Sequence, residues 1–156
     1  MMTDAQIIAK YGQPGDLKNI TTITLPYPFR YIIAPGKFVS VSKMQCHKLV
    51  APKFLAVFND LLKHYGYDRI KTLGIDFYSG CFNVRKMRGS KTKWSRHSWG
   101  LPVDLDPLRN GLNTKWKDSE FAKPEYAALH EIFEKHGFFN YGKVKGYDAM
   151  HFEIAA

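Results

Sequence analysis

The order of helical and β-rich segments limits the folds open to this chain. Helices are expected over TDAQIIAKYG, APKFLAVFNDLLKHYG and PEYAALHEIFEKHG, the last two having apolar residues at helical spacing. Residues 18–45 hold three short β-rich pieces, TTITL, YPFRYII and FVSVS, and later strands are expected within IKTLGIDFYSGCFNV, GLPVDLD and MHFEI. Because helices and strands do not alternate regularly, the sequence predicts an α+β fold in which helices flank an antiparallel sheet.

Glycine, proline and a capping residue set the expected boundaries of these elements. Thr3 is a suitable N-cap for the first helix, and Gly12 is a suitable stop. Pro26, Pro28 and the Pro35–Gly36 pair are expected to separate the three β-rich pieces.

The length and composition indicate one small globular domain spanning residues 1–156. The chain is 45% hydrophobic and has no apolar run near the ~20 residues that span a bilayer, so stable membrane insertion is not expected. The N-terminus lacks the pattern of a secretory signal, which predicts synthesis in the cytoplasm. Two cysteines, Cys46 and Cys81, are too few for a disulfide framework, and we expect reduced thiols in a monomeric protein.

The formal net charge of +9 calls for an anionic partner or surface, and leaves its identity open. Part of this charge lies in RKMRGSKTKWSR, which has six basic residues and includes Trp94. Such a run suits a nucleic-acid contact, which makes a basic nucleic-acid-binding protein without catalysis one hypothesis. The run also suits a rim that attracts an anionic substrate, or simply a solvated loop.

Two separated segments carry residues typical of a catalytic metal site. SRHSWGLPVDLD contains His97 and, seven residues later, Asp104, and DAMHFE near the C-terminus contains His151. Two imidazoles and one carboxylate form a three-ligand zinc set that leaves a fourth position for water. Residues seven apart on an ideal strand point to opposite faces, so a bend or bulge at Gly100 or Pro102 is expected.

Each of these residues also has an ordinary interpretation. His97 could be a loop histidine, and His151 a hydrogen-bonded histidine on a strand. Cys81 is a possible soft ligand, although a buried cysteine more often acts as a small apolar residue. Glu153 shares a strand face with His151, so it could act as a base or orient that histidine.

The motifs resemble those of the M15 family of zinc D-Ala-D-Ala carboxypeptidases and L-alanyl-D-glutamate endopeptidases. SRHSWGLPVD matches the family motif SxHxxGxxxD, and DAMHFE matches the second motif, in which an acidic residue lies three before a histidine. YSGCFNVRKMRGS resembles the preceding family strand and its arginine. The resemblance covers roughly residues 45–154, and KYGQPGD and LPYPFR are similar to the N-terminus of phage and prophage members.

This resemblance implies a hedgehog/DD-peptidase-like zinc peptidase core and a role for each matching residue. His97, Asp104 and His151 correspond to the zinc ligands, and Asp148 to the catalytic acid/base. Two further matches are Arg85, at the position that binds or polarises the substrate, and Ser95, beside the site. In one departure, Asp148 stands where many endopeptidase members have Glu. In another, Val103 replaces the small residue that usually precedes the aspartate ligand.

The expected activity is therefore zinc-dependent hydrolysis of a peptide bond in the stem peptides of bacterial peptidoglycan. The similarity to phage members favours an endolysin-type L-alanyl-D-glutamate endopeptidase that reaches the wall after the membrane is breached. A D-Ala-D-Ala carboxypeptidase of the same family is the alternative. Arg85 and Arg88 suit the free carboxylates of stem peptides, and under this interpretation nucleic acid is not a partner.

Overall fold

The computed structural model describes residues 1–156 and contains a single six-stranded sheet in the order β2-β1-β3-β4-β6-β5. The strands are β1 (Ile20–Ala34), β2 (Lys37–His47), β3 (Phe77–Gly80), β4 (Pro102–Leu105), β5 (Phe138–Asn140) and β6 (His151–Ile154). The helices are α1 (Asp4–Tyr11), α2 (Ala51–Tyr65), α3 (Tyr67–Leu73), α4 (Ala127–Lys135) and α5 (Tyr141–Lys145). Short 3-10 helices lie at η1 (Leu17–Asn19), η2 (Arg96–Trp99), η3 (Trp116–Asp118), η4 (Glu120–Ala122) and η5 (Pro124–Tyr126).

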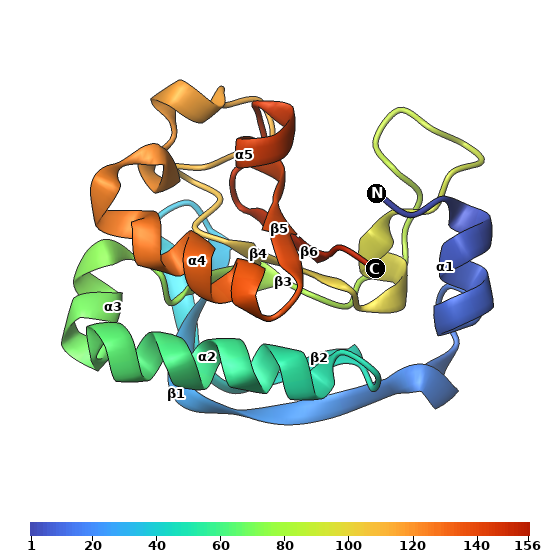
Figure 1. The fold of residues 1–156 in the computed structure, drawn as a ribbon, viewed down its shortest axis with the longest axis horizontal. Helices are drawn as coiled ribbons and strands as arrows, with labels where there is room; N and C mark the ends of the chain where they lie inside the picture. The colour runs from blue at the N-terminus through green and yellow to red at the C-terminus, as the bar shows by residue number, and fades with distance from the viewer.

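The α+β class is confirmed, but the sheet is mixed rather than wholly antiparallel. β1 pairs with β3 in parallel, and every other neighbouring pair is antiparallel. Between β1 and β3 the chain forms β2 and then passes through α2 and α3, a connection long enough to return it to the same end of the sheet. Figure 1 shows α2 and α4 next to each other over the sheet, with α1 and both termini at one end of the molecule.

The N-terminal β-rich region forms two long strands, not three short pieces. Pro26 and Pro28 lie inside β1, and the pairing with β2 shifts register between Thr24 and Phe29. A proline has no N–H to donate, and this irregular stretch lets both prolines remain within a continuous strand. The turn expected at the Pro35–Gly36 pair is present, between β1 and β2.

The helices expected near residues 3–12, 51–66 and 124–137 are confirmed, with η5 preceding α4 in the last of them. Thr3 forms a capping box with Gln6 at the start of α1. The strand expected over residues 70–84 begins later, because its first residues belong to α3. Ile70 and Leu73 are buried on one face of that helix, and Gly74 ends it in the left-handed conformation.

An aromatic core joins α2 and α4 to strands β5 and β6. Phe54 of α2 contacts Phe138 of β5, with ring centroids 4.7 Å apart, and Phe133 of α4 stacks on Phe152 of β6 at 4.1 Å. Because Phe152 follows His151 directly, this packing fixes the position of β6. None of the helices is long and apolar enough to cross a membrane.

Candidate metal centre

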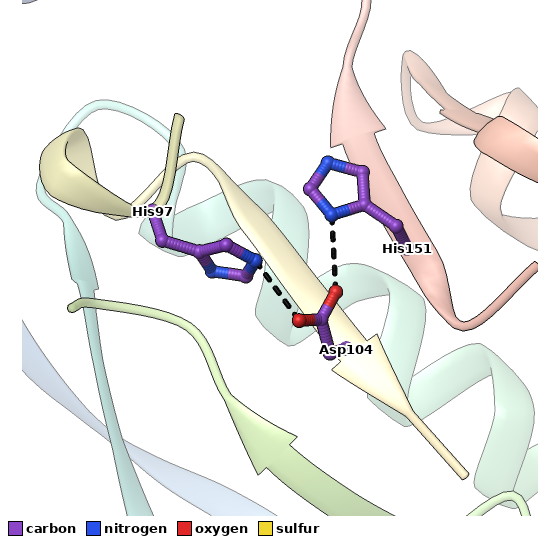
Figure 2. Close-up of side chains that lie close together, drawn as sticks. All are labelled: His97, Asp104 and His151. Carbon is purple, nitrogen blue, oxygen red and sulfur yellow. Dashed lines mark hydrogen bonds and ion pairs between the residues drawn. The ribbon is translucent and has the colours of Figure 1, made fainter. Parts of the chain in front are cut away.

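His97, Asp104 and His151 come together from three elements that meet at β4 (Figure 2). His97 lies on η2, Asp104 on β4, and His151 is the first residue of β6, directly opposite Asp104 in the antiparallel ladder. One nitrogen of each imidazole and the carboxylate oxygens lie within 4.8 Å of one another. Asp104 is central to the group: its Oδ2 is 3.0 Å from His97 Nε2, and its Oδ1 is 3.0 Å from His151 Nδ1.

Gly100 makes the turn that brings His97 and Asp104 to the same side. The expected bend is there, but His97 lies on a short 3-10 helix rather than on a bent strand. Gly100 ends that helix with φ 70° and ψ 32°, in the left-handed region, and β4 begins two residues later. An added Cβ at Gly100 would also lie 2.7 Å from the backbone nitrogen of His47. Both the conformation and the close approach of β2 therefore require glycine.

We expect Gly100→Ala to destabilise the protein by about 3 kcal/mol, combining the cost of a left-handed alanine with that of overpacking. Gly146→Ala is a matched control, because Gly146 also caps a helix at positive φ but has open space around it. The control should lose only about 1 kcal/mol. Urea unfolding of both variants measures the difference, and equal losses would show that the contact with His47 has no energetic consequence.

The outer nitrogens of both histidines are held by acceptors. His97 Nδ1 lies 2.7 Å from the carbonyl oxygen of Cys81, and His151 Nε2 lies 2.9 Å from Glu153 Oε1. A carbonyl or carboxylate oxygen only accepts, so these two nitrogens donate to it, and the other nitrogen of each ring, which faces Asp104, is the one that could hold a metal ion. Hydrogen bonds of this kind orient the ligand histidines of zinc sites. Cys81 thus contributes its backbone carbonyl, while its buried thiol lies outside the three-residue group.

The ionisation of Asp104 and His151 fits a site for a cation. Burial alone would lower the pKa of His151, but hydrogen bonds to Asp104 and Glu153 raise that pKa to about 10. Burial alone would raise the pKa of Asp104, but the two imidazoles hold it well below its usual range. Without a metal ion, His151 therefore keeps an extra proton between the carboxylates of Asp104 and Glu153. A bound divalent cation would replace that proton.

The donor set and its spacing fit zinc. Two ligand atoms, each about 2.0–2.1 Å from a tetrahedral zinc ion, lie roughly 3.3 Å apart. The two nitrogen–oxygen separations of 3.0 Å are close to that value. His97, Asp104 and His151 would hold the ion, and the buried Cys81 carbonyl and Glu153 would fix the two rings.

Asp148 lies beside this group on the turn that leads into β6. It has a φ of 62°, a conformation that aspartate tolerates better than most residues. The residue is buried, and its Oδ1 has no hydrogen-bond partner. Burial raises the pKa of Asp148 and the nearby Asp104 carboxylate adds to the rise, against the opposing charges of His151, His97 and Arg88. A buried carboxylate without a partner for one oxygen suits a group that exchanges protons.

A cavity of about 730 Å³ contains the three-residue group and Asp148. Four more of the residues singled out from the sequence, Arg85, Arg88, Ser95 and Glu153, also line this cavity, whereas Cys81 does not. Ser95 is buried, and its hydroxyl accepts a hydrogen bond from the backbone N–H of His97 at 3.3 Å, so it caps η2. Arg85 is half-buried, and Arg88 is exposed further along the same loop.

The basic segment 85–96 forms a hairpin-like loop at the edge of the cavity. Backbone pairing joins Lys86 to Trp94 and Arg85 to Ser95. The ammonium group of Lys86 lies 3.5 Å from the centroid of the Trp94 ring. This cation–π contact covers part of the ring that a nucleic-acid base would stack on. The position of the loop suits the rim of a substrate cavity.

Several residues of the cavity carry no signal in the sequence. Met1 and Asp4 line it, and Asp4 Oδ1 accepts a hydrogen bond from Arg96 Nη1 at 2.6 Å. Trp99 Nε1 donates to the carbonyl of Gly12 at 2.8 Å, so the N-terminal segment holds both ends of η2. Tyr141, at the start of α5, also lines the cavity. Met1 and Asp4 lie far from the motifs in the chain, and no local pattern places them or Tyr141 near His97.

Comparison with known proteins gives one family match, and the matched region contains both metal-site motifs. Residues 88–154 match the model of a peptidase family, M15, described as D-alanyl-D-alanine carboxypeptidase. The matched region includes His97, Asp104, Asp148 and His151, whereas Arg85 lies just before it. Neither curated proteins nor solved structures gave a match to the chain.

Proposed function

We propose that this chain is a zinc-dependent peptidase of bacterial peptidoglycan stem peptides, and the match of residues 88–154 to the M15 family model supports the proposal. One observation carries this proposal. Two imidazoles and a carboxylate with the spacing of zinc ligands share a cavity with Asp148, a buried carboxylate that has an unpartnered oxygen. Such a combination suits hydrolysis with a metal ion and a separate base.

When bound to the three-residue group, zinc supplies the Lewis acidity that makes a water molecule nucleophilic at neutral pH. Asp148 accepts a proton from the attacking water as the water oxygen bonds to the carbonyl carbon of the scissile peptide. The same carboxyl group then donates the proton to the leaving nitrogen as the carbon–nitrogen bond breaks. The protons balance, and Asp148 returns to its ionised form.

Arg85 and Arg88 bring positive charge to the loop side of the cavity. Stem peptides carry free carboxylates, which guanidinium groups bind through paired hydrogen bonds. Arg85 is the better placed of the two to contact the reacting carbonyl or a neighbouring carboxylate, since it is half-buried while Arg88 is exposed. Ser95 acts through His97, whose backbone it caps.

The scissile bond that we propose is the L-alanyl-D-glutamate bond, in an enzyme of the endolysin type that acts on the wall after the membrane is breached. The residues 1–156 form the catalytic unit in this proposal. The description of the matching family favours a second candidate, removal of the terminal D-alanine by carboxypeptidase action. The two activities leave different new termini.

Digestion of purified peptidoglycan tests the proposal and separates the two candidates. Wild-type protein with zinc should release new N- and C-termini that mass spectrometry identifies, and chelated protein should release none. A new N-terminal D-glutamate indicates the endopeptidase, and free D-alanine indicates the carboxypeptidase. No new terminus with zinc-loaded protein would contradict the peptidoglycan substrate.

A further inference from the structure

Tyr141 has a position in the cavity that the motifs do not explain. Its ring lies edge-on to the imidazole of His151, with centroids 5.2 Å apart and planes at 85°. It lines the same cavity as Asp148 and His97. The aromatic packing places this tyrosine beside one of the three residues that we propose to hold the metal.

The backbone of Tyr141 is fixed to the turn that contains Asp148. The side chain of Asn140 caps α5 by accepting from Lys143 N–H at 3.1 Å, and it also donates to the carbonyl of Ala149 at 2.7 Å. Gly142 lies so close to this turn that an added Cβ would be 2.6 Å from the Cβ of Ala149. The start of α5 and the Asp148 turn therefore form one tightly packed unit.

The hydroxyl of Tyr141 makes no hydrogen bond within the protein, so the fold does not use it. A phenol hydroxyl is protonated at neutral pH, and Tyr141 lines the cavity together with Asp148 and Glu153. It takes part in none of the side-chain hydrogen bonds that hold α5, which come from Asn140 and Lys143.

We propose that Tyr141 is a catalytic residue whose hydroxyl donates a hydrogen bond to the carbonyl oxygen of the scissile peptide as negative charge builds on it. This role rests on the proposed function and names a further group in the same site. A neutral donor held rigidly beside the reacting carbonyl stabilises the transition state more than the ground state. The ring contact with His151 and the Asn140 bond supply the rigidity, and the unused hydroxyl supplies the donor.

Tyr141→Phe tests the role, because phenylalanine keeps the ring against His151 and removes only the hydroxyl. Stem-peptide hydrolysis by zinc-loaded protein should show kcat lowered about 10²-fold with KM little changed. A phosphinate analogue of the tetrahedral intermediate should bind less tightly by a similar factor. Zinc affinity, measured by chelator competition, and the thermal midpoint should match wild type.

Tyr31→Phe is the matched control, since Tyr31 is a partly buried tyrosine that lies outside this cavity. Its kcat should stay near the wild-type value. A wild-type kcat in Tyr141→Phe, a loss confined to KM, or a loss that excess zinc restores would each overturn the proposed role. Active wild-type protein with an unaffected Tyr141→Phe variant would reject this role alone, whereas inactive wild-type protein would reject the peptidase function as well.

Discussion

Asp148→Asn should lower kcat for stem-peptide hydrolysis by about 10²–10⁴-fold while the protein still binds one zinc ion. Asparagine keeps the size of the side chain and tolerates the left-handed conformation found here, with φ 62°. It cannot take a proton from water and return it to the leaving nitrogen. Activity assays on defined peptides, together with the zinc content of the same samples, measure the effect. A variant that retained near wild-type kcat would exclude Asp148 as the base.

Glu153→Gln should be compared with Asp148→Asn, because Glu153 is the other candidate base that the sequence offers. In the structure its carboxylate accepts the hydrogen bond from His151 Nε2 at 2.9 Å, so we expect it to orient that ring. The amide oxygen of glutamine can still accept this hydrogen bond but lacks the negative charge, and substitution of such a partner typically weakens metal affinity by about 10–100-fold. Excess zinc should therefore restore activity to Glu153→Gln and should fail to restore it to Asp148→Asn. The reverse pattern would exchange the two roles.

Chelation should abolish hydrolysis and lower the thermal midpoint, and added zinc should reverse both effects. A ligand at 100 times its dissociation constant stabilises the folded protein by about 2.7 kcal/mol, which corresponds to roughly 5–10 °C for a chain of this size. Without the cation, Asp104 and Glu153 share protons with His151 instead. Differential scanning fluorimetry with and without zinc measures the shift.

Substitution of a single ligand tests whether the shift comes from the proposed centre. His151→Ala removes one of the three ligands and should lose the zinc-dependent rise in midpoint along with activity. His64→Ala replaces an exposed histidine outside the cavity and should behave as wild type. If His151→Ala bound one zinc ion as tightly as the wild-type protein, the metal would have to lie elsewhere.

Much of the fold follows from local sequence signals. The Thr3 capping box and the apolar spacing of α2 act over a few residues, and both helices form where expected. Two of the differences from the expected elements have local causes as well. Pro26 and Pro28 would end most strands, but the register shift in the β1–β2 hairpin accommodates them. The segment after Gly66 contains too few residues for its helical spacing to stand out from the strand that follows.

The sequence alone determined which residues could bind a metal, because His97, Asp104 and His151 lie in motifs whose residue types suit zinc. Only the tertiary structure decided how they meet. The opposition of Asp104 to His151 depends on the register of β4 and β6, which are separated by more than forty residues of chain. The same holds for the contacts of Glu153, Tyr141 and Asp4. Such contacts depend on the folding of the whole chain, since strand register and side-chain packing join residues that no short-range pattern connects.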